Sequence, residues 1–483
     1  MSNYKPYPSM LSALLLLLVT ASAVSAQSKQ RPPNFIIILA DDLGYGDLGS
    51  YGHPTIETPY LDQLAQEGTR FTQFYVAASV CSPSRAALLT GRLPVRTGIT
   101  GGLGVFFPHS ATGLPHTEIT IAKALQQKGY HTGIVGKWHL GSLPDYLPTH
   151  YGFDEYFGIP YSNDMEPNNA AHIPYPALPL YKGNKVIEEN PDQRLLTQRY
   201  TTAAVDFIKS NKDKPFFLYY PNNAPHVPLF ASPAFAGKSK RGQYGDVVQE
   251  FDWSVGQIVK TLKELKLDNN TFVLFLSDNG PWLTQHENGG SAGLLRDGKS
   301  SAWEGGTRVP AIAWWPGTIP PRVSTAITSS LDILPTLLHQ AGATVPADKP
   351  IDGVDITAVL TGKNDTVRTI IYYYDSDKLY AIRKGSWKAH FSTHSGYSPQ
   401  PPQQHATPLL YNIENDPSEK EDVSSSHSDI VAALQQLYTA QLAAAPVAPS
   451  ELSRFQPGEL NNAFQQFIQK RKEQAASAAP ATK

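Results

Sequence analysis

The 483-residue sequence contains a single cysteine, Cys81, so the chain cannot form an internal disulfide bond. It also lacks a basic excess, because 40 lysines and arginines are balanced by 42 aspartates and glutamates. This balance argues against a nucleic-acid partner. Apart from one run near the N-terminus, long apolar stretches are absent, so we expect no membrane span. The length and the hydrophobic content of 41% are typical of a globular protein with one large and one smaller domain.

The N-terminal residues have the three-part pattern of a secretory signal peptide. Lys5 lies in a short charged start, residues 11–19 form an apolar run, and the small residues VSA precede Gln27. The apolar run is too short to span a bilayer comfortably. We therefore expect residues 1–26 to be a cleaved signal peptide and the protein to be periplasmic or secreted.

Four apolar runs end in polar, chemically capable residues. They are NFIIILADD, HTGIVGKWHLG, KPFFLYYPNNAPHVP and TFVLFLSDNG. Because they lack polar alternation, these runs are typical of strands buried on both faces of a parallel sheet. Helical patterns at 58–71, 117–130, 244–267 and 329–343 alternate with the strands, which predicts an α/β fold. Since ligands bind beyond the carboxyl ends of such strands, we expect the four polar sets to converge.

The pattern changes after about residue 345. Short aromatic and β-branched runs joined by turns predict a small antiparallel sheet within residues 366–450. Residues 428–445 are expected to form a helix that covers this sheet. Residues 451–483 form a C-terminal extension whose end, from Ala475, has the composition of a disordered tail.

Cys81 opens the stretch CSPSR. Pro83 suits the first turn of a helix, which places Cys81 at the N-terminus, where the backbone favours negative charge. Arg85 follows one turn later on the same face. An anion at position 81 would therefore meet both a helix end and a guanidinium. The alternative for a lone cysteine is a small buried apolar residue.

Two further sets of residues are suited to binding a cation or an anionic substrate. Two acidic loops at strand ends would repel each other unless a cation lies between them, and their oxygens suit Ca²⁺ or Mg²⁺. Lysines and histidines at the other loops could neutralise and protonate an anionic substrate. The alternatives are helix caps and turns for the acidic residues, and structural hydrogen bonds for the histidines. The acidic loops hold Asp41, Asp42, Asp278 and Asn279, and the basic set is Lys137, His139, His226 and Lys299.

These motifs occur in a fixed order along the chain. CSPSR is accompanied by LADDLGYGDLGSYG, GIVGKWHLG, APHVP, SDNGP and LLRDGKSSAWEGGTRVP. Over about residues 32–440 the sequence resembles the type I, formylglycine-dependent sulfatases, and within them the arylsulfatase A-like group. The resemblance implies an alkaline-phosphatase-like fold, with a large, mixed, mostly parallel sheet flanked by helices. The catalytic α/β domain would comprise residues 32–365, and the antiparallel-sheet subdomain residues 366–450.

The resemblance also implies roles for individual residues. A maturation enzyme, the formylglycine-generating enzyme or an equivalent, would oxidise Cys81 to Cα-formylglycine, whose hydrate attacks the sulfur of a sulfate ester. One Ca²⁺, with Mg²⁺ as the alternative, would be held by Asp41, Asp42, Cys81, Asp278 and Asn279. The catalytic set would be Cys81, Arg85, Lys137, His139, His226 and Lys299. The substrate would be a sulfated carbohydrate, and small aryl sulfates would also be cleaved.

Three other functions remain open at this point. A phosphatase or phosphodiesterase of the same superfamily generally uses two metals, and Asn279 stands where a second site commonly has histidine. A non-catalytic glycan-binding relative would have lost catalytic residues, and an unmodified cysteine hydrolase would retain the thiol. For specificity, the sequence offers loops 101–116, 160–195 and 281–298. Candidate pocket residues are Tyr161, His172, Trp282 and His286, whereas His405 is expected to be structural or exposed.

Overall fold

The central feature of the computed structural model is a mixed sheet of eleven strands. The structure describes residues 1–4, 31–102, 104–458, 462–467, 469–470 and 473. The expected signal peptide and the tail from Ala475 therefore fall outside the described residues, apart from residues 1–4. The strands of the sheet are β1 (Asn34–Ala40), β2 (Thr69–Tyr75), β3 (His131–Val135), β4 (Glu155–Gly158), β5 (Pro179–Lys182), β6 (Lys185–Glu189), β7 (Phe216–Pro221), β8 (Thr271–Ser277), β9 (Arg308–Trp314), β10 (Arg322–Ser324) and β11 (Thr328–Ser329).

The four apolar runs singled out in the sequence form the centre of this sheet. They are β8, β1, β7 and β3, which are neighbours in that order and pair in parallel. In β1, Ile37 lies between Tyr219 of β7 and Leu274 of β8. All seven residues of β1 are buried, as expected for a strand covered on both faces. The predicted α/β fold with a mostly parallel sheet is confirmed.

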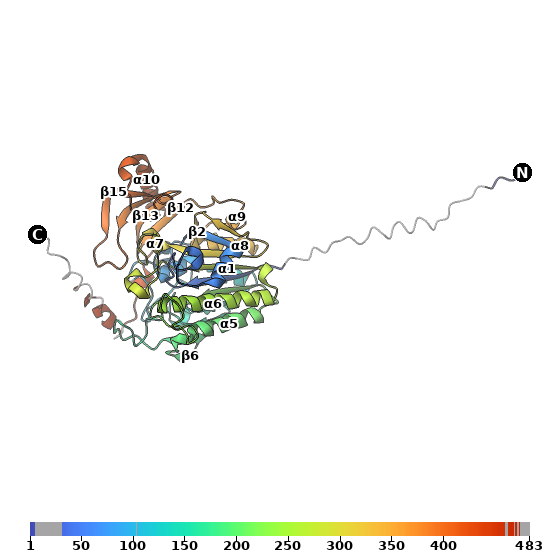
Figure 1. The fold of residues 1–483 in the computed structure, drawn as a ribbon, viewed down its shortest axis with the longest axis horizontal. Helices are drawn as coiled ribbons and strands as arrows, with labels where there is room; N and C mark the ends of the chain where they lie inside the picture. The colour runs from blue at the N-terminus through green and yellow to red at the C-terminus, as the bar shows by residue number, and fades with distance from the viewer. Residues whose placement is uncertain (5–30, 103, 459–461, 468, 471–472, 474–483) are drawn as a thin grey trace. The chain divides into compact units, whose positions relative to one another are not determined.

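Helices cover both faces of the sheet. On one face, Ile36 and Ile38 pack with apolar residues of α1, α5 and α6, and Figure 1 shows α5 and α6 running side by side. On the other face, Phe35 and Ile37 pack with residues of α2, α4 and α8. The helices are α1 (Pro59–Glu67), α2 (Cys81–Thr90), α3 (Pro94–Thr97), α4 (Ile121–Gln127), α5 (Leu196–Ser210), α6 (Gln243–Glu264), α7 (Glu304–Thr307), α8 (Ile333–Gln340), α9 (Thr357–Leu360) and α10 (Ser428–Ala444). No helix in the described part of the chain has the length and apolarity needed to cross a bilayer.

The helices expected from the sequence are present, with ends that lie inside or close to those of the patterns that predicted them. Helix α1 ends at Glu67 because Gly68 follows it, and strand β2 begins at Thr69. The backbone of Gly68 lies so close to β9 that an added Cβ would be 2.3 Å from the carbonyl oxygen of Ala313. The missing side chain of Gly68 therefore lets strand β2 begin directly beside β9, where Thr69 pairs with Ala313.

A second sheet lies in the C-terminal part of the chain, as predicted. Its strands are β12 (Ile370–Asp375), β13 (Lys378–Lys384), β14 (Trp387–Thr393) and β15 (Gln403–Asn412), all paired antiparallel in chain order. Helix α10 packs against this sheet, with Leu434 among the buried residues of the shared core. Figure 1 shows α10 beside these strands.

Glu304 joins the two sheets through a buried ionic cluster. Its carboxylate accepts hydrogen bonds from Tyr75 of β2 at 2.6 Å and from Tyr373 of β12 at 2.8 Å. The ammonium of Lys388 on β14 lies 3.1 Å away, and both charged side chains are fully buried. Burial alone would raise the pKa of Glu304, but Lys388 and Arg383 outweigh this effect and hold the pKa far below its usual value. The carboxylate is therefore ionised and bridges both sheets.

We expect Glu304→Gln to lower the free energy of unfolding by about 3 kcal/mol, because the buried Lys388 and Arg383 lose a charged partner. Urea unfolding measures this change. The matched control is Glu264→Gln, which removes an exposed carboxylate 3.8 Å from Lys260. Such a surface pair contributes no more than about 0.5 kcal/mol. Equal effects of the two substitutions would contradict a structural role for the cluster.

Candidate active site

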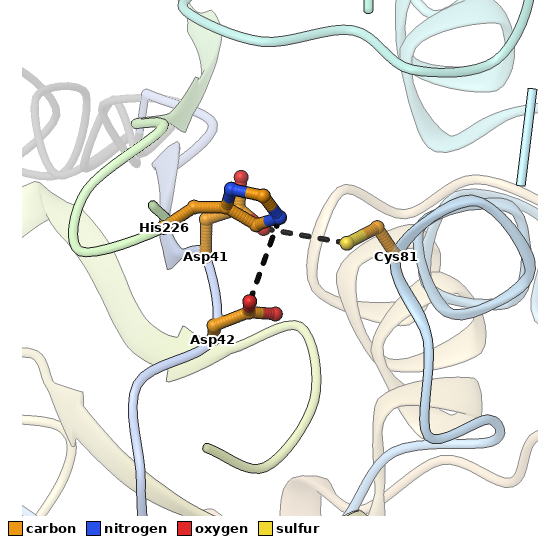
Figure 2. Close-up of side chains that lie close together, drawn as sticks. All are labelled: Asp41, Asp42, Cys81 and His226. Carbon is orange, nitrogen blue, oxygen red and sulfur yellow. Dashed lines mark hydrogen bonds and ion pairs between the residues drawn. The ribbon is translucent and has the colours of Figure 1, made fainter. Parts of the chain in front are cut away.

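The carboxyl ends of the four central strands bring their polar loops to one place. Asp41 and Asp42 follow β1, and His226 lies in the loop after β7. Cys81 begins helix α2 and faces them, as Figure 2 shows. Potential ligand atoms of these four residues lie within 4.8 Å of one another, and all four residues are buried. The convergence expected from the strand ends is therefore present.

The residues of the CSPSR stretch make different local contacts. Cys81 is the first residue of α2, and its Sγ lies 3.4 Å from Oδ1 of Asp41. The hydroxyls of Ser82 and Ser84 point elsewhere and donate to the backbone carbonyls of His139 and Asp278. Pro83 occupies the first turn, where its missing N–H costs nothing. The stretch thus attaches the helix to two neighbouring loops and leaves Cys81 and Arg85 directed at the site.

Arg85 and Lys137 neutralise two buried carboxylates. Nε of Arg85 donates to Asp278 at 3.0 Å, and Nη2 of Arg85 lies 3.4 Å from Oδ1 of Asp41. Nζ of Lys137 is 2.6 Å from Oδ2 of Asp41. Burial would raise the pKa of Asp41, but Lys137 and Arg85 outweigh it and hold that pKa well below the usual value. Burial and repulsion by Asp41 raise the pKa of Asp278 to about 7, with Arg85 opposing the shift.

Asn279 has a free ligand atom that fits a cation. Its Nδ2 donates to Oδ1 of Asp42 at 2.7 Å, while its Oδ1 is buried and has no hydrogen-bond partner among the described residues. An unpaired carbonyl oxygen next to carboxylates is the donor set that hard divalent cations take. Asp42 has a φ of 65°, a strained backbone conformation typical of functional sites. The residues present therefore fit a divalent cation.

Lys299 and His226 both lie against the carboxylate of Asp42. Nζ of Lys299 lies 2.8 Å from Oδ2 of Asp42 and 3.2 Å from Nε2 of His226. Burial lowers the pKa of His226, the charge of Lys299 lowers it further, and Asp42 opposes both. Lys299 also lies over the ring of Trp282, 4.4 Å from its centroid.

His139 and Lys137 are positioned by the backbone after β3. Gly136 has a φ of +130°, and an added Cβ would lie 2.0 Å from the carbonyl oxygen of Pro221 on β7. This close approach lets the N–H of Lys137 donate to the same carbonyl at 2.7 Å. His139 has a φ of 61°, and its Nε2 lies 3.0 Å from the carbonyl oxygen of Phe106. Its Nδ1 is buried without a partner in the described part of the chain.

All the residues singled out for catalysis and metal binding thus lie in one buried cluster. The residues suggested as lining the pocket have different environments. The expectation that Tyr161 lines the pocket is wrong, because its side chain is 4% exposed, packs in the core and donates to Ala177. His172 and His286 are exposed. His405 is hydrogen-bonded to Thr393 within the C-terminal sheet.

Sequence reasoning missed one residue of the cluster. Ser162, in the loop after β4, accepts a hydrogen bond from Nζ of Lys137 at 3.2 Å and is 1% exposed. Its hydroxyl and the carboxylate of Asp41 together hold the ammonium of Lys137. Serine is common in loops, and no spacing in the sequence distinguishes Ser162 from its neighbours.

Comparison with known proteins identifies the family. The sequence profile described as Sulfatase matches residues 33–343, and the profile of the C-terminal region of aryl-sulfatase matches residues 366–473. The chain is 43% identical to human arylsulfatase A, over 92% of this chain and 94% of the relative. It is 40% identical to N-acetylgalactosamine-6-sulfatase from Canis lupus familiaris, over 88% of both chains.

A solved structure supports the same relationship. The crystal structure of Ps i-CgsB in complex with k-i-k-neocarrahexaose superposes with a TM-score of 0.75 at 32% identity. The match covers 93% of this chain and 100% of that one. Together with the two family profiles, these similarities agree with the resemblance inferred from CSPSR and its companion motifs. The chain therefore belongs to the sulfatase family and is a sulfuric ester hydrolase.

Proposed function

We propose that the chain hydrolyses the sulfate esters of carbohydrates, and small aryl sulfates as well, through a formylglycine at position 81 and one divalent cation. The observation that carries the proposal is the buried contact of Cys81 with Asp41 and Lys137, whose atoms lie 3.4 and 3.9 Å from Sγ. A cysteine at a helix N-terminus, among both carboxylates and lysines, is suited to joining a cation site to an anion site. In this proposal residues 32–365 are the catalytic domain and residues 366–450 the C-terminal subdomain.

The cation would be held by oxygens of the two acidic loops and of the modified residue 81. Ca²⁺ suits an all-oxygen site with several carboxylates, and Mg²⁺ is the alternative. A divalent cation bound there would polarise a sulfate oxygen and favour an ionised hydroxyl beside it. Its ligands would be Asp41, Asp42, Asp278 and Asn279, together with the oxidised Cys81.

Oxidation of Cys81 to Cα-formylglycine would supply an aldehyde whose hydrate provides the attacking hydroxyl. The chain's part in that chemistry is electrostatic. Arg85, which is fully buried, holds Asp41 and Asp278 in place and adds positive charge where the hydroxyl would ionise. A formylglycine-generating enzyme, or an equivalent, is the partner that this chemistry requires.

Two lysines and two histidines serve the sulfate ester. Lys137 and Lys299, which pair with Asp41 and Asp42 respectively, would hold the sulfate oxygens. His226, 3.2 Å from Lys299, would give a proton to the leaving oxygen. His139, whose Nδ1 has no partner in the described residues, would accept a proton from a hydroxyl of residue 81.

Carbohydrate substrates are supported by the similar proteins. One relative is an N-acetylgalactosamine-6-sulfatase, and the Ps i-CgsB structure contains k-i-k-neocarrahexaose. The N-terminal pattern of a signal peptide at residues 1–26 suits a periplasmic or secreted enzyme acting on external sulfated glycans.

The first test combines sulfate release with the mass of the peptide that contains Cys81. We expect protein from its native host to release sulfate from 4-nitrophenyl sulfate and from N-acetylgalactosamine 6-sulfate. The peptide mass should show carbonyl oxygen in place of sulfur, and Cys81→Ala should abolish release. 4-Nitrophenyl phosphate serves as the paired substrate. Faster hydrolysis of the phosphate, or an unaltered thiol in active protein, would contradict the proposal.

Metal binding is tested at Asn279. We expect Asn279→Ala to weaken Ca²⁺ binding at least about tenfold, because it removes the unpaired Oδ1 and the hydrogen bond that orients Asp42. Isothermal titration of chelator-treated protein with Ca²⁺, and separately with Mg²⁺, measures the change. Asn269→Ala, which alters an exposed asparagine before β8, is the control. Unchanged affinity in Asn279→Ala would exclude this residue as a ligand.

The position of Lys137 is tested through Gly136. We expect Gly136→Ala to lower sulfate release at least about tenfold, because the new Cβ would push the chain away from Pro221 and move Lys137. Gly183→Ala is the matched control, since Gly183 also has a positive φ, +58°, but nothing within 4 Å of an added Cβ. Its cost is limited to about 1 kcal/mol of backbone strain. Kinetics of both variants report displacement of Lys137, and thermal unfolding of both reports the backbone strain, so the two effects can be separated.

A further inference from the structure

A loop of the C-terminal sheet reaches the segment that carries Lys299. This loop, residues 394–402, connects β14 to β15. The N–H of Gly396 donates to Oδ2 of Asp297 at 3.0 Å, and a Cβ on Gly396 would lie 2.3 Å from the carbonyl oxygen of Lys299. The two segments are therefore in close backbone contact. The next residue of the loop is Tyr397.

Tyr397 forms the outer layer of an aromatic stack over the catalytic wall. Its ring stacks on Trp282, with centroids 5.0 Å apart and planes inclined by 24°. Trp282 in turn lies over Lys299 and has its ring centroid 5.5 Å from that of His226. Tyr397 has a φ of 57° and yet remains 43% exposed. A bulky residue held in a strained conformation with an exposed ring is a feature found at functional sites.

The hydroxyl of Tyr397 shares the electrostatic environment of this wall. Burial raises its pKa, and the positive charge of Lys299 opposes the shift.

We propose that Tyr397 forms a platform for the sugar ring that carries the sulfate ester, with the apolar face of that ring packed on the Tyr397 side chain. The proposal rests on the carbohydrate sulfatase function proposed above. The electron-rich face of an aromatic ring attracts the C–H groups of a pyranose. Aromatic walls with a few placed polar groups are typical of small-molecule sites. Because Tyr397 stacks on Trp282, and Trp282 contacts both Lys299 and His226, a sugar ring on Tyr397 would lie beside the groups proposed to act on its sulfate ester.

Steady-state kinetics with N-acetylgalactosamine 6-sulfate tests the platform. We expect Tyr397→Ala to raise KM about tenfold while kcat changes less than about threefold, because the lost contact is with the ring and not with the reacting sulfur. Tyr397→Phe should retain the wild-type KM within about threefold. Inhibition by inorganic sulfate should be unchanged in both variants, since sulfate does not contact the platform. Tyr60→Ala, at a tyrosine on α1 that is 41% exposed, is the control.

A second substrate and an inhibitor check the platform. We expect Tyr397→Ala to raise KM for 4-nitrophenyl sulfate as well, because its aromatic ring can pack on the same side chain. Equal loss of sulfate inhibition and substrate affinity in Tyr397→Ala would overturn the platform, because it would indicate general damage to the site.

A binding measurement separates this proposal from the proposed function. In the Cys81→Ala background, saturation-transfer NMR should detect N-acetylgalactosamine 6-sulfate, and the additional Tyr397→Ala change should abolish the signal. If binding depends on Tyr397 but the wild-type enzyme releases no sulfate from this sugar, the platform stands and the proposed activity on this sugar fails. If the enzyme releases sulfate but neither KM nor binding depends on Tyr397, or if no binding is detected, the platform is refuted.

Discussion

The mutual neutralisation of charges in a water-poor site is the constraint on which the rest of this structure depends. Three carboxylates and three cationic side chains are buried at the ends of the central strands: Asp41, Asp42, Asp278, Arg85, Lys137 and Lys299. None of them could be buried alone without a cost of several kcal/mol. Parallel strands in the order β8, β1, β7 and β3 bring the acidic loops and Lys137 together, and helix α2 supplies Arg85. The formal charges cancel, so the proposed divalent cation and a sulfate dianion would be accommodated as a pair.

The C-terminal sheet supports this site and is not merely attached to it. Glu304 bridges the sheets, and its backbone N–H donates to Glu419 at 2.7 Å. Five residues before Glu304, Lys299 lies in the site. The segment between them is thus fixed at one end by a buried ionic cluster and at the other by Asp42. The loop that carries Tyr397 contacts the same segment, so both sheets determine where Lys299 stands.

Sequence patterns predicted the parts of the molecule that obey local rules. The runs that became β1, β3, β7 and β8 are uniformly apolar because both faces of the sheet are covered, and the chemically capable residues follow them directly. The order of the sequence motifs then indicated which charged residues belong to the site. Ser162 and Tyr397 escaped prediction because they lie in irregular loops, and their positions depend on contacts between distant segments. The prediction that Tyr161 lines the pocket failed for the same reason, since an aromatic residue in a loop can pack into the core as readily as into a pocket.

The burial of Cys81 restricts when it can be chemically altered. Its side chain is 1% exposed, and it is enclosed by residues as late in the chain as Asp278 and Lys299. A protein large enough to be an oxidising catalyst cannot reach this thiol once those residues are in place. The modification proposed for Cys81 would therefore have to precede completion of the fold, for example on a nascent or translocating polypeptide, and refolded unmodified protein would be out of reach of that catalyst.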